Sequence, residues 1–116
     1  MNFEETINDA IKTQEFDGAK TIFAHVAGKL FDHFYSKFVD IDKDEAVEEC
    51  VKICLGGLDR FPEEYKFERT KSFNYFTTIM LCHLRQLYRK TGRKPHPYKY
   101  DFVGFKKELT DIGLIQ

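Results

Sequence analysis

The chain has 116 residues, a formal net charge of −1, 12 Phe and no Trp. This length suits one domain, and a domain of this size buries enough surface to form a core without metal or disulfide staples. No apolar run approaches the roughly 20 residues that span a bilayer, and the polar, acidic start of the chain is unlike a signal peptide. The sequence therefore predicts a soluble intracellular protein whose three cysteines are reduced and buried as small hydrophobic residues.

The first part of the chain carries two stretches of helical periodicity. Phe3, Ile7 and Ile11 predict an amphipathic helix over residues 3–13. A longer helix is predicted from about 17 to 37. Its expected buried stripe is Ala19, Ile22, Phe23, Val26, Leu30, Phe31, Phe34 and Phe38. The small residues on an adjacent face, where another helix can pack closely, are Ala24, Ala27 and Gly28.

A strongly acidic segment follows and leads into a third helix. Either Asp42 or Asp44 is a candidate N-cap, because a carboxylate can accept a hydrogen bond from the first free N–H groups of a helix. The helix is expected to run to about Leu58, where Gly56-Gly57 weaken it and Pro62 prevents its continuation. The residues expected to face inward are Val47, Cys50, Val51, Cys54 and Leu58.

The last part of the chain predicts one long and one short helix. The long one spans about 72–90 and is capped by Thr70 or Ser72. Its expected buried stripe is Phe73, Phe76 or Thr77, Met80, Leu84 and Leu87. A short helix is expected over about 101–109, with Phe102, Phe105 and Leu109 buried. Since no strand pattern occurs, we expect an all-α, compact bundle of four to five helices, with a main domain over 1–93 and a C-terminal extension over 94–116.

Metal sites are weakly supported. Asp40, Asp42 and Asp44 have the spacing of the first calcium-loop ligands, but Glu45 stands where that loop needs Gly and Val51 where it needs a ligand. Zinc sites bring close-spaced ligand pairs together at turns. The candidate zinc ligands here, which lie within predicted helices and suit core packing better, are Cys50, Cys54, Cys82 and His83. We therefore expect no metal and no other cofactor.

No catalytic motif appears either: the sequence has no nucleophile elbow, no phosphate-binding glycine loop and no zinc-protease motif. An enzyme is therefore the least favoured class. The pattern that stands out is instead a sorting of charge. Between Glu68 and Asp101 there is no acidic residue. The cations in that interval are Arg69, Lys71, Arg85, Arg89, Lys90, Arg93, Lys94 and Lys99.

Aromatic residues are interleaved with these cations. They are Phe73, Tyr75, Phe76, Tyr88, Tyr98 and Tyr100. Cations neutralise phosphates and rings stack on unpaired bases, so the pattern favours a nucleic-acid surface. The alternative is an ordinary core helix whose basic end complements the helix dipole. The acidic helix start from Asp44 to Glu49 would suit a second, basic protein partner.

Three stretches occur in a particular order: EAVEEC at 45–50, LDRFPE at 58–63 and FNYFTT at 73–78. Together, residues 44–90 resemble the second conserved region of bacterial sigma factors, in the compact form of the late sigma factors of T4-like bacteriophages. That family has Asp-Leu-x-Gln-Glu-Gly, Val-Asp-Lys-Phe-Asp-Pro and Phe-Ser-Thr-Tyr-Ala-Thr in the corresponding places. The chain departs from the family at Ile79 and Met80, where many members carry Trp.

The resemblance implies a minimal transcription initiation factor that acts in the cytoplasm of a bacterium or a phage-infected cell. It implies that Glu45, Glu48 and Glu49 dock on the clamp-helices coiled coil of the largest subunit of bacterial core RNA polymerase. It also implies that the outer side of the following helix binds promoter DNA, mainly the melted non-template strand of a minus-ten-like element. The residues it assigns to DNA are Lys71, Tyr75, Phe76, Ile79, His83, Arg85, Gln86, Arg89, Lys90 and Arg93.

Within that set, Tyr75, Phe76 and Ile79 would line a base-capture site, whereas His83 and Gln86 would read its upstream edge. The family's later promoter-reading regions have no counterpart in this sequence, so a co-activator or a sliding clamp is implied as a further partner. Two alternatives remain. One is an all-helical interaction protein, such as a polymerase-binding adaptor or inhibitor. The other is a stand-alone module that binds single-stranded nucleic acid, and none of the three involves a membrane.

Overall fold

Five α-helices and no strand make up the part of the chain that the structure, a computed structural model, describes: residues 2–34, 41–58, 71–90 and 102–114. The helices are α1 (Phe3–Thr13), α2 (Asp17–Phe34), α3 (Lys43–Leu58), α4 (Lys71–Lys90) and α5 (Phe102–Asp111). The predicted all-α bundle is confirmed. In the described ranges, no helix combines the length and the apolar character needed to cross a bilayer.

Side chains cap two of the helices at their N-termini. The N–H of Glu5 donates to Asn2 Oδ1 over 3.2 Å at the start of α1, and the N–H of Glu45 donates to Asp42 Oδ1 over 3.0 Å at the start of α3. Each bond satisfies a backbone donor that the helix itself leaves free. Of the two candidate caps for α3, Asp42 is therefore the one used.

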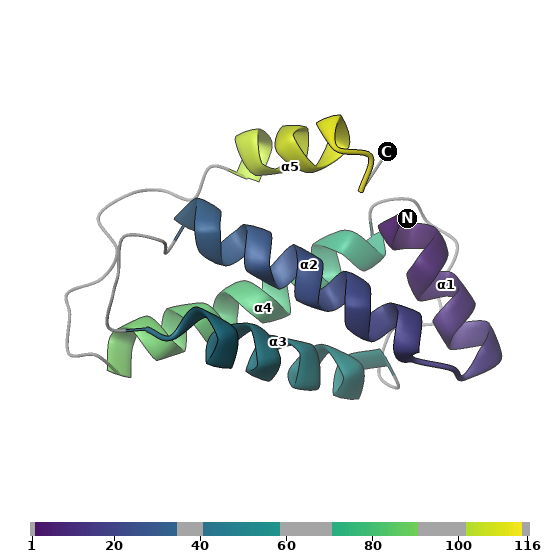
Figure 1. Cartoon of the computed structure of the whole chain (residues 1–116), viewed down its shortest axis with the longest axis horizontal. Helices are drawn as coiled ribbons and strands as arrows, with labels where there is room; N and C mark the ends of the chain where they lie inside the picture. Colours follow the sequence, from purple (N-terminus) through teal and green to yellow (C-terminus); the bar gives the residue numbers. More distant parts are fainter. Residues whose placement is uncertain (1, 35–40, 59–70, 91–101, 115–116) are drawn as a thin grey trace.

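The helices α2, α3 and α4 run antiparallel to their neighbours, and α1 packs across one end of them (Figure 1). The helix α5 lies over the bundle near the start of α1. There the N–H of Phe3 donates to the carbonyl of Leu114 over 2.8 Å. Phe105 and Leu109 of α5 are fully buried, so the described part of the predicted C-terminal extension contributes to the same core as α1 to α4.

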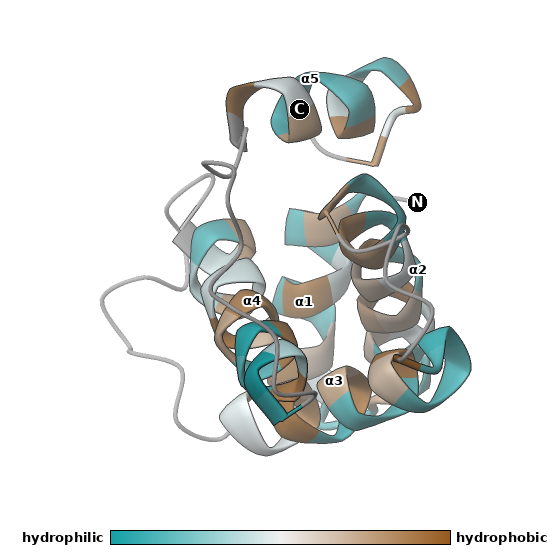
Figure 2. Ribbon diagram, turned by 90° about the vertical axis from the view of Figure 1, so that its left-hand side faces the viewer, coloured by the Kyte–Doolittle hydropathy of each residue, from teal (hydrophilic) through white to brown (hydrophobic). Residues whose placement is uncertain are grey.

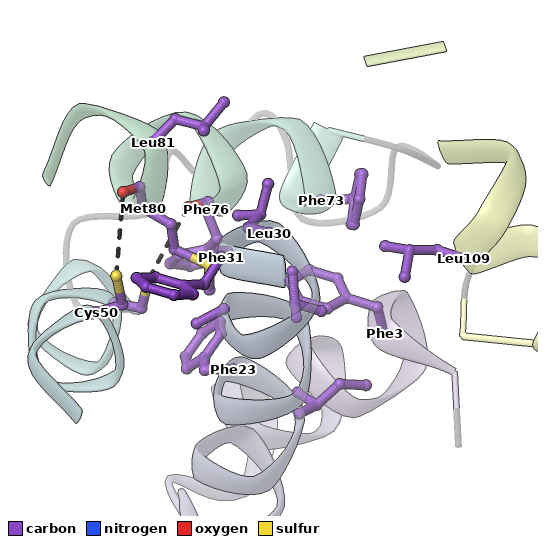
Figure 3. Close-up of a cluster of buried hydrophobic side chains, with 14 of the residues drawn as sticks. Phe3, Phe23, Leu30, Phe31, Cys50, Phe73, Phe76, Met80, Leu81 and Leu109 are labelled. Carbon is purple, nitrogen blue, oxygen red and sulfur yellow. Dashed lines mark hydrogen bonds between the residues drawn. The ribbon is translucent and has the colours of Figure 1, made fainter. Parts of the chain in front are cut away.

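Phenylalanine rings of α1, α2 and α4 meet in the core, where Leu109 of α5 also points (Figure 3), and Phe105 of α5 is buried there too. The ring of Phe3 lies 5.4 Å from that of Phe73, almost perpendicular to it, and Phe23 lies 4.9 Å from Phe76. Such pairs contribute about 0.5–1.5 kcal/mol beyond the apolar area they bury. Hydrophobic residues of the packed helices turn toward one another and hydrophilic residues outward, as Figure 2 shows. The core thus depends on rings that are far apart in the sequence.

Most of the predicted buried stripes lie in this core. In α4 both Phe76 and Thr77 are buried, while Leu87 is half-buried and Tyr88 is buried. In α3, Val47 and Val51 are only half-buried, because Ala46 and Gly57 occupy the inner positions. The predicted roles of Phe38, Thr70 and the Phe102 side chain lie outside the described residues. Ser72 is buried in the first turn of α4, where its hydroxyl donates to the Glu4 carboxylate.

The three cysteines differ in their surroundings. Cys50 and Cys54 are fully buried on α3, as predicted. Cys82 is exposed, so the prediction that all three are buried is wrong at that position. The reason is helical geometry: position 82 lies on the side of α4 opposite its buried stripe and faces outward with Thr78 and Gln86.

Candidate functional site

The predicted functional residues that the structure describes lie on the antiparallel pair α3 and α4 (Figure 1). The two helices approach closely where Gly57 faces α4. A Cβ atom on Gly57 would lie 3.4 Å from the ring of Phe76 and 3.5 Å from Ile79 Cδ1. Further along, the thiols of Cys50 and Cys54 lie 4.0 and 3.9 Å from the carbonyl oxygens of Met80 and Phe76. This alignment places the first turns of α3 beside the last turns of α4.

The two buried cysteines are unreactive at neutral pH. Burial raises the pKa of Cys50 to about 12, and the neighbouring Glu49 carboxylate adds to this effect. Burial likewise raises the pKa of Cys54, with a smaller contribution from Cys50. Since the thiolate is the nucleophile and the metal ligand, these residues act as core side chains. Within the described ranges, no three His, Cys, Asp or Glu side chains gather as a metal site would require.

The residues predicted to bind polymerase form an acidic ridge along α3, defined here as Glu45, Glu48 and Glu49. Glu45 and Glu48 are exposed, and Glu49 is half-buried. The ridge separates two depressions. Glu48 lines a groove of about 680 Å³ between α2 and α3. Glu45 and Glu49 line a pocket of about 420 Å³ between α3 and α4, together with Leu87 and Lys90.

The walls of the groove between α2 and α3 differ in net charge. From α2, Lys20 and Lys29 outnumber Asp32, whereas from α3, Asp44 and Glu48 outnumber Lys43. Its apolar lining residues are Ala24, Gly28, Val47 and Val51. The predicted small face of α2 therefore does meet α3, but it leaves an open groove there. At one end, Lys43 and Asp32 form an ion pair with an N–O distance of 2.8 Å.

Seven of the residues predicted to bind DNA lie together on the accessible side of α4, which we call the outer face. Four are exposed: Arg85, Gln86, Arg89 and Lys90. Three are half-buried: Tyr75, Ile79 and His83. Spacings of three, four and seven residues bring them to one side of a helix. Lys71 opens α4, but its side chain lies outside the described residues, as does the whole of Arg93.

Phe76 does not belong to this face. Its side chain is 0% exposed, and its ring packs against Phe23 and Phe3 in the core (Figure 3). The prediction that Phe76 lines a base-capture site is therefore wrong, because the ring cannot stack on a base while it fills the core. The buried rings of α4 also include Phe73 and Tyr88. Tyr75 is half-buried, with its ring 5.1 Å from that of Phe76.

One contact joins the acidic ridge to the outer face of α4. His83 Nε2 lies 2.7 Å from Glu49 Oε2, and the two side chains are 16% and 42% exposed. Sequence reasoning assigned these residues to two separate partners and missed the contact. The acidic and basic patches therefore adjoin each other. Lys90 agrees with this, since it lines the same pocket as Glu45 and Glu49. Glu49 and His83 are 34 residues apart in the sequence. Their contact could have been predicted only by aligning the two predicted helices as an antiparallel pair.

Comparison of the chain with known proteins yields no significant match to a family model, a curated protein or a solved structure.

Proposed function

We propose that this protein is a minimal sigma-like transcription initiation factor that binds bacterial core RNA polymerase and recognises melted promoter DNA. The observation that carries the proposal is the placement of an accessible acidic ridge beside an accessible basic face on one antiparallel helix pair. The order of the three sequence stretches that resemble sigma region 2 agrees with this placement, since the first lies on α3 and the third begins α4.

The acidic ridge is suited to a basic protein surface. Glu45 and Glu48 are exposed carboxylates within one turn of α3, so both can meet cations on the clamp-helices coiled coil. Opposite charges of this kind increase the association rate and fix the register of two partners more than they increase affinity. The depressions on both sides of the ridge add apolar surface from Val47, Val51 and Leu87.

The outer face of α4 is suited to a single strand of DNA. Arg89 and Lys90 are exposed near the end of the helix, where each can neutralise a phosphate. Among the described rings of α4, Tyr75 alone is accessible enough to stack on a base, at roughly 1–3 kcal/mol per base. Base capture in this proposal therefore depends on Tyr75 with Ile79 beside it, and not on Phe76.

Co-elution with bacterial core RNA polymerase on a sizing column tests the proposal. The wild-type protein should co-elute at low salt, and Glu45→Lys combined with Glu48→Lys should abolish co-elution because it reverses the charge of the ridge. Asp9→Lys with Glu15→Lys is the matched control, since both residues are exposed and the change in charge is the same. The proposal is wrong if the wild-type protein does not co-elute, or if the ridge variant binds as well as the control.

A second candidate is an interaction protein that binds polymerase without reading DNA. The observation that favours it is the groove between α2 and α3, whose two walls differ in net charge. A partner helix with an acidic and a basic side could bind there in one orientation. The burial of Phe73, Phe76 and Tyr88 also leaves α4 fewer rings for bases than its sequence suggests. This candidate predicts co-elution with polymerase but no promoter-dependent transcription.

A further inference from the structure

The groove between α2 and α3 is an accessible face of the bundle. Its lining comes from these two helices alone, and its volume is about 680 Å³. Both helices lie at the front in Figure 1, with α4 behind them. The apolar floor of the groove consists of four half-buried residues: Ala24, Gly28, Val47 and Val51. Small residues let another helix approach closely, and covering the apolar side chains is favourable.

Charged side chains border this floor with opposite signs on the two helices. Asp32 and Lys43 are already paired with each other across one end of the groove. With that pair set aside, the permanent charges of the lining are Lys20 and Lys29 on α2 and Asp44 and Glu48 on α3. Within the part of the chain that the structure describes, no ion pair engages these four side chains. The face is therefore basic along one helix and acidic along the other.

Such a face is complementary to a second copy of itself. A two-fold axis parallel to the helices places α2 of one copy against α3 of the other, so each basic helix meets an acidic one. The heights agree as well: a Cβ atom on Gly28 would lie 3.9 Å from Lys43 Cε, so the adjacent Lys29 and Asp44 stand at similar heights along the pair. The four helices then form an antiparallel bundle with both apolar floors at its centre. An axis across the helices would instead set α2 against α2 and bring like charges together.

We propose that the protein forms a symmetric homodimer through the groove between α2 and α3, in which α2 of each copy packs against α3 of the other. This dimer does not depend on polymerase or on DNA. Glu48 belongs both to the groove and to the acidic ridge, so the dimer covers part of the ridge. A second copy therefore competes with any partner that binds the ridge at Glu48. Because the interface is small, the dissociation constant is expected to be micromolar or weaker.

Sedimentation velocity measures the dimer directly. The wild-type protein should shift from its monomer mass of 13.7 kDa toward twice that value as its concentration rises from about 1 µM to about 1 mM. Lys20→Glu with Lys29→Glu should weaken the dimer at least roughly tenfold, because attraction between α2 and α3 of the second copy becomes repulsion. Lys12→Glu with Lys107→Glu is the matched control: both lysines are exposed outside the groove, and the net charge changes equally.

A mixture of two oppositely reversed variants gives the sharpest result. Asp44→Lys with Glu48→Lys should also weaken the dimer, because both sides of the groove are then basic. One variant carries a fluorophore on the exposed thiol of Cys82 and is mixed with an equal amount of the other. The two should associate about as tightly as the wild-type protein, since every contact between α2 and α3 of different copies again joins opposite charges. Recovered association also shows that both variants are folded.

The homodimer is excluded if the wild-type protein remains monomeric over this concentration range, or if the mixture associates no better than either variant alone. Ala24→Arg tests the floor of the groove separately. The monomer has room for this side chain in the open groove, whereas the dimer does not, so association should weaken by about tenfold. Unchanged association of that variant would also overturn the proposal. A groove that stays free in this way would be left to the partner helix of the second candidate function.

Discussion

The two sides of α4 differ sharply, although the sequence mixes their residues. The inner side carries Phe73, Phe76 and Met80, which are at most 1% exposed and pack against α1, α2 and α3. The outer face carries Gln86, Arg89 and Lys90, which are exposed, with Tyr75 and Ile79 at its border. Rings and cations that alternate along the chain are therefore separated in space by the helical period. Most of the rings stabilise the fold, and the cations remain available for binding.

Substitution on the inner side should have the largest effect. Phe76→Ala should lower the free energy of unfolding by roughly 3–5 kcal/mol, because it leaves a cavity among Phe3, Phe23 and Tyr75. Urea unfolding followed by circular dichroism measures this. Arg89→Ala on the outer face is the control and should change stability by no more than about 0.5 kcal/mol. Similar stabilities for both variants would contradict the assignment of the two sides.

The contact of α4 with α3 can be tested with two adjacent glycines. Gly57→Leu should destabilise the protein by roughly 1–3 kcal/mol, since the added side chain collides with Phe76 and Ile79. Gly56→Leu should be neutral or stabilising by up to about 1 kcal/mol, because no atom lies within 4 Å of its added Cβ and leucine favours a helix over glycine. Thermal unfolding measures the stability of both variants. A Gly56→Leu variant less stable than the Gly57→Leu variant would contradict the alignment of α3 with α4.

The outer face should control the salt dependence of binding to single strands. Arg89→Ala with Lys90→Ala should reduce the slope of log affinity against log salt by roughly 1.4, because each lost phosphate contact accounts for about 0.7. Lys12→Ala with Lys52→Ala, an equal loss of exposed charge on α1 and α3, should leave the slope unchanged. Fluorescence anisotropy at several salt concentrations distinguishes the pairs, and equal slopes would show that α4 has no special role.

The smallest expected effect is on stability at alkaline pH, and it distinguishes the buried thiol of Cys50 on α3 from the exposed thiol of Cys82 on α4. The folded state keeps Cys50 protonated up to about pH 12, whereas an ordinary thiol loses its proton near 9.0. The stability that this thiol contributes is therefore complete below pH 9 and falls as the pH rises from 9 toward 12, by on the order of 1 kcal/mol at pH 10. Cys50→Ala should flatten the alkaline decline seen in urea unfolding, while Cys82→Ala should not. A decline unchanged by Cys50→Ala would mean that other groups cause it.

The helices were largely predictable because their signals are local. The stripe of Phe3, Ile7 and Ile11 gave the observed bounds of α1, and the acidic segment before α3 contained its cap, Asp42. Phe76 was expected both in the core stripe and in a base-capture site, and burial resolved this conflict in favour of the core. The exposure of Cys82 follows from the period of α4 and could have been predicted from its spacing to Thr78 and Gln86. The Glu49–His83 bridge depends on how α3 and α4 align, which periodicity within either helix does not specify.

Initiation itself is the most direct test of the proposed function. Bacterial core RNA polymerase would transcribe a pool of linear templates with a randomised segment upstream of a common transcribed region, with and without this protein, and the transcribed templates would be sequenced. The proposal predicts that the protein enriches templates carrying a minus-ten-like element at a fixed distance from the start, and that Tyr75→Ala with Arg89→Ala abolishes the enrichment. Transcripts with the same template distribution as polymerase alone would contradict it.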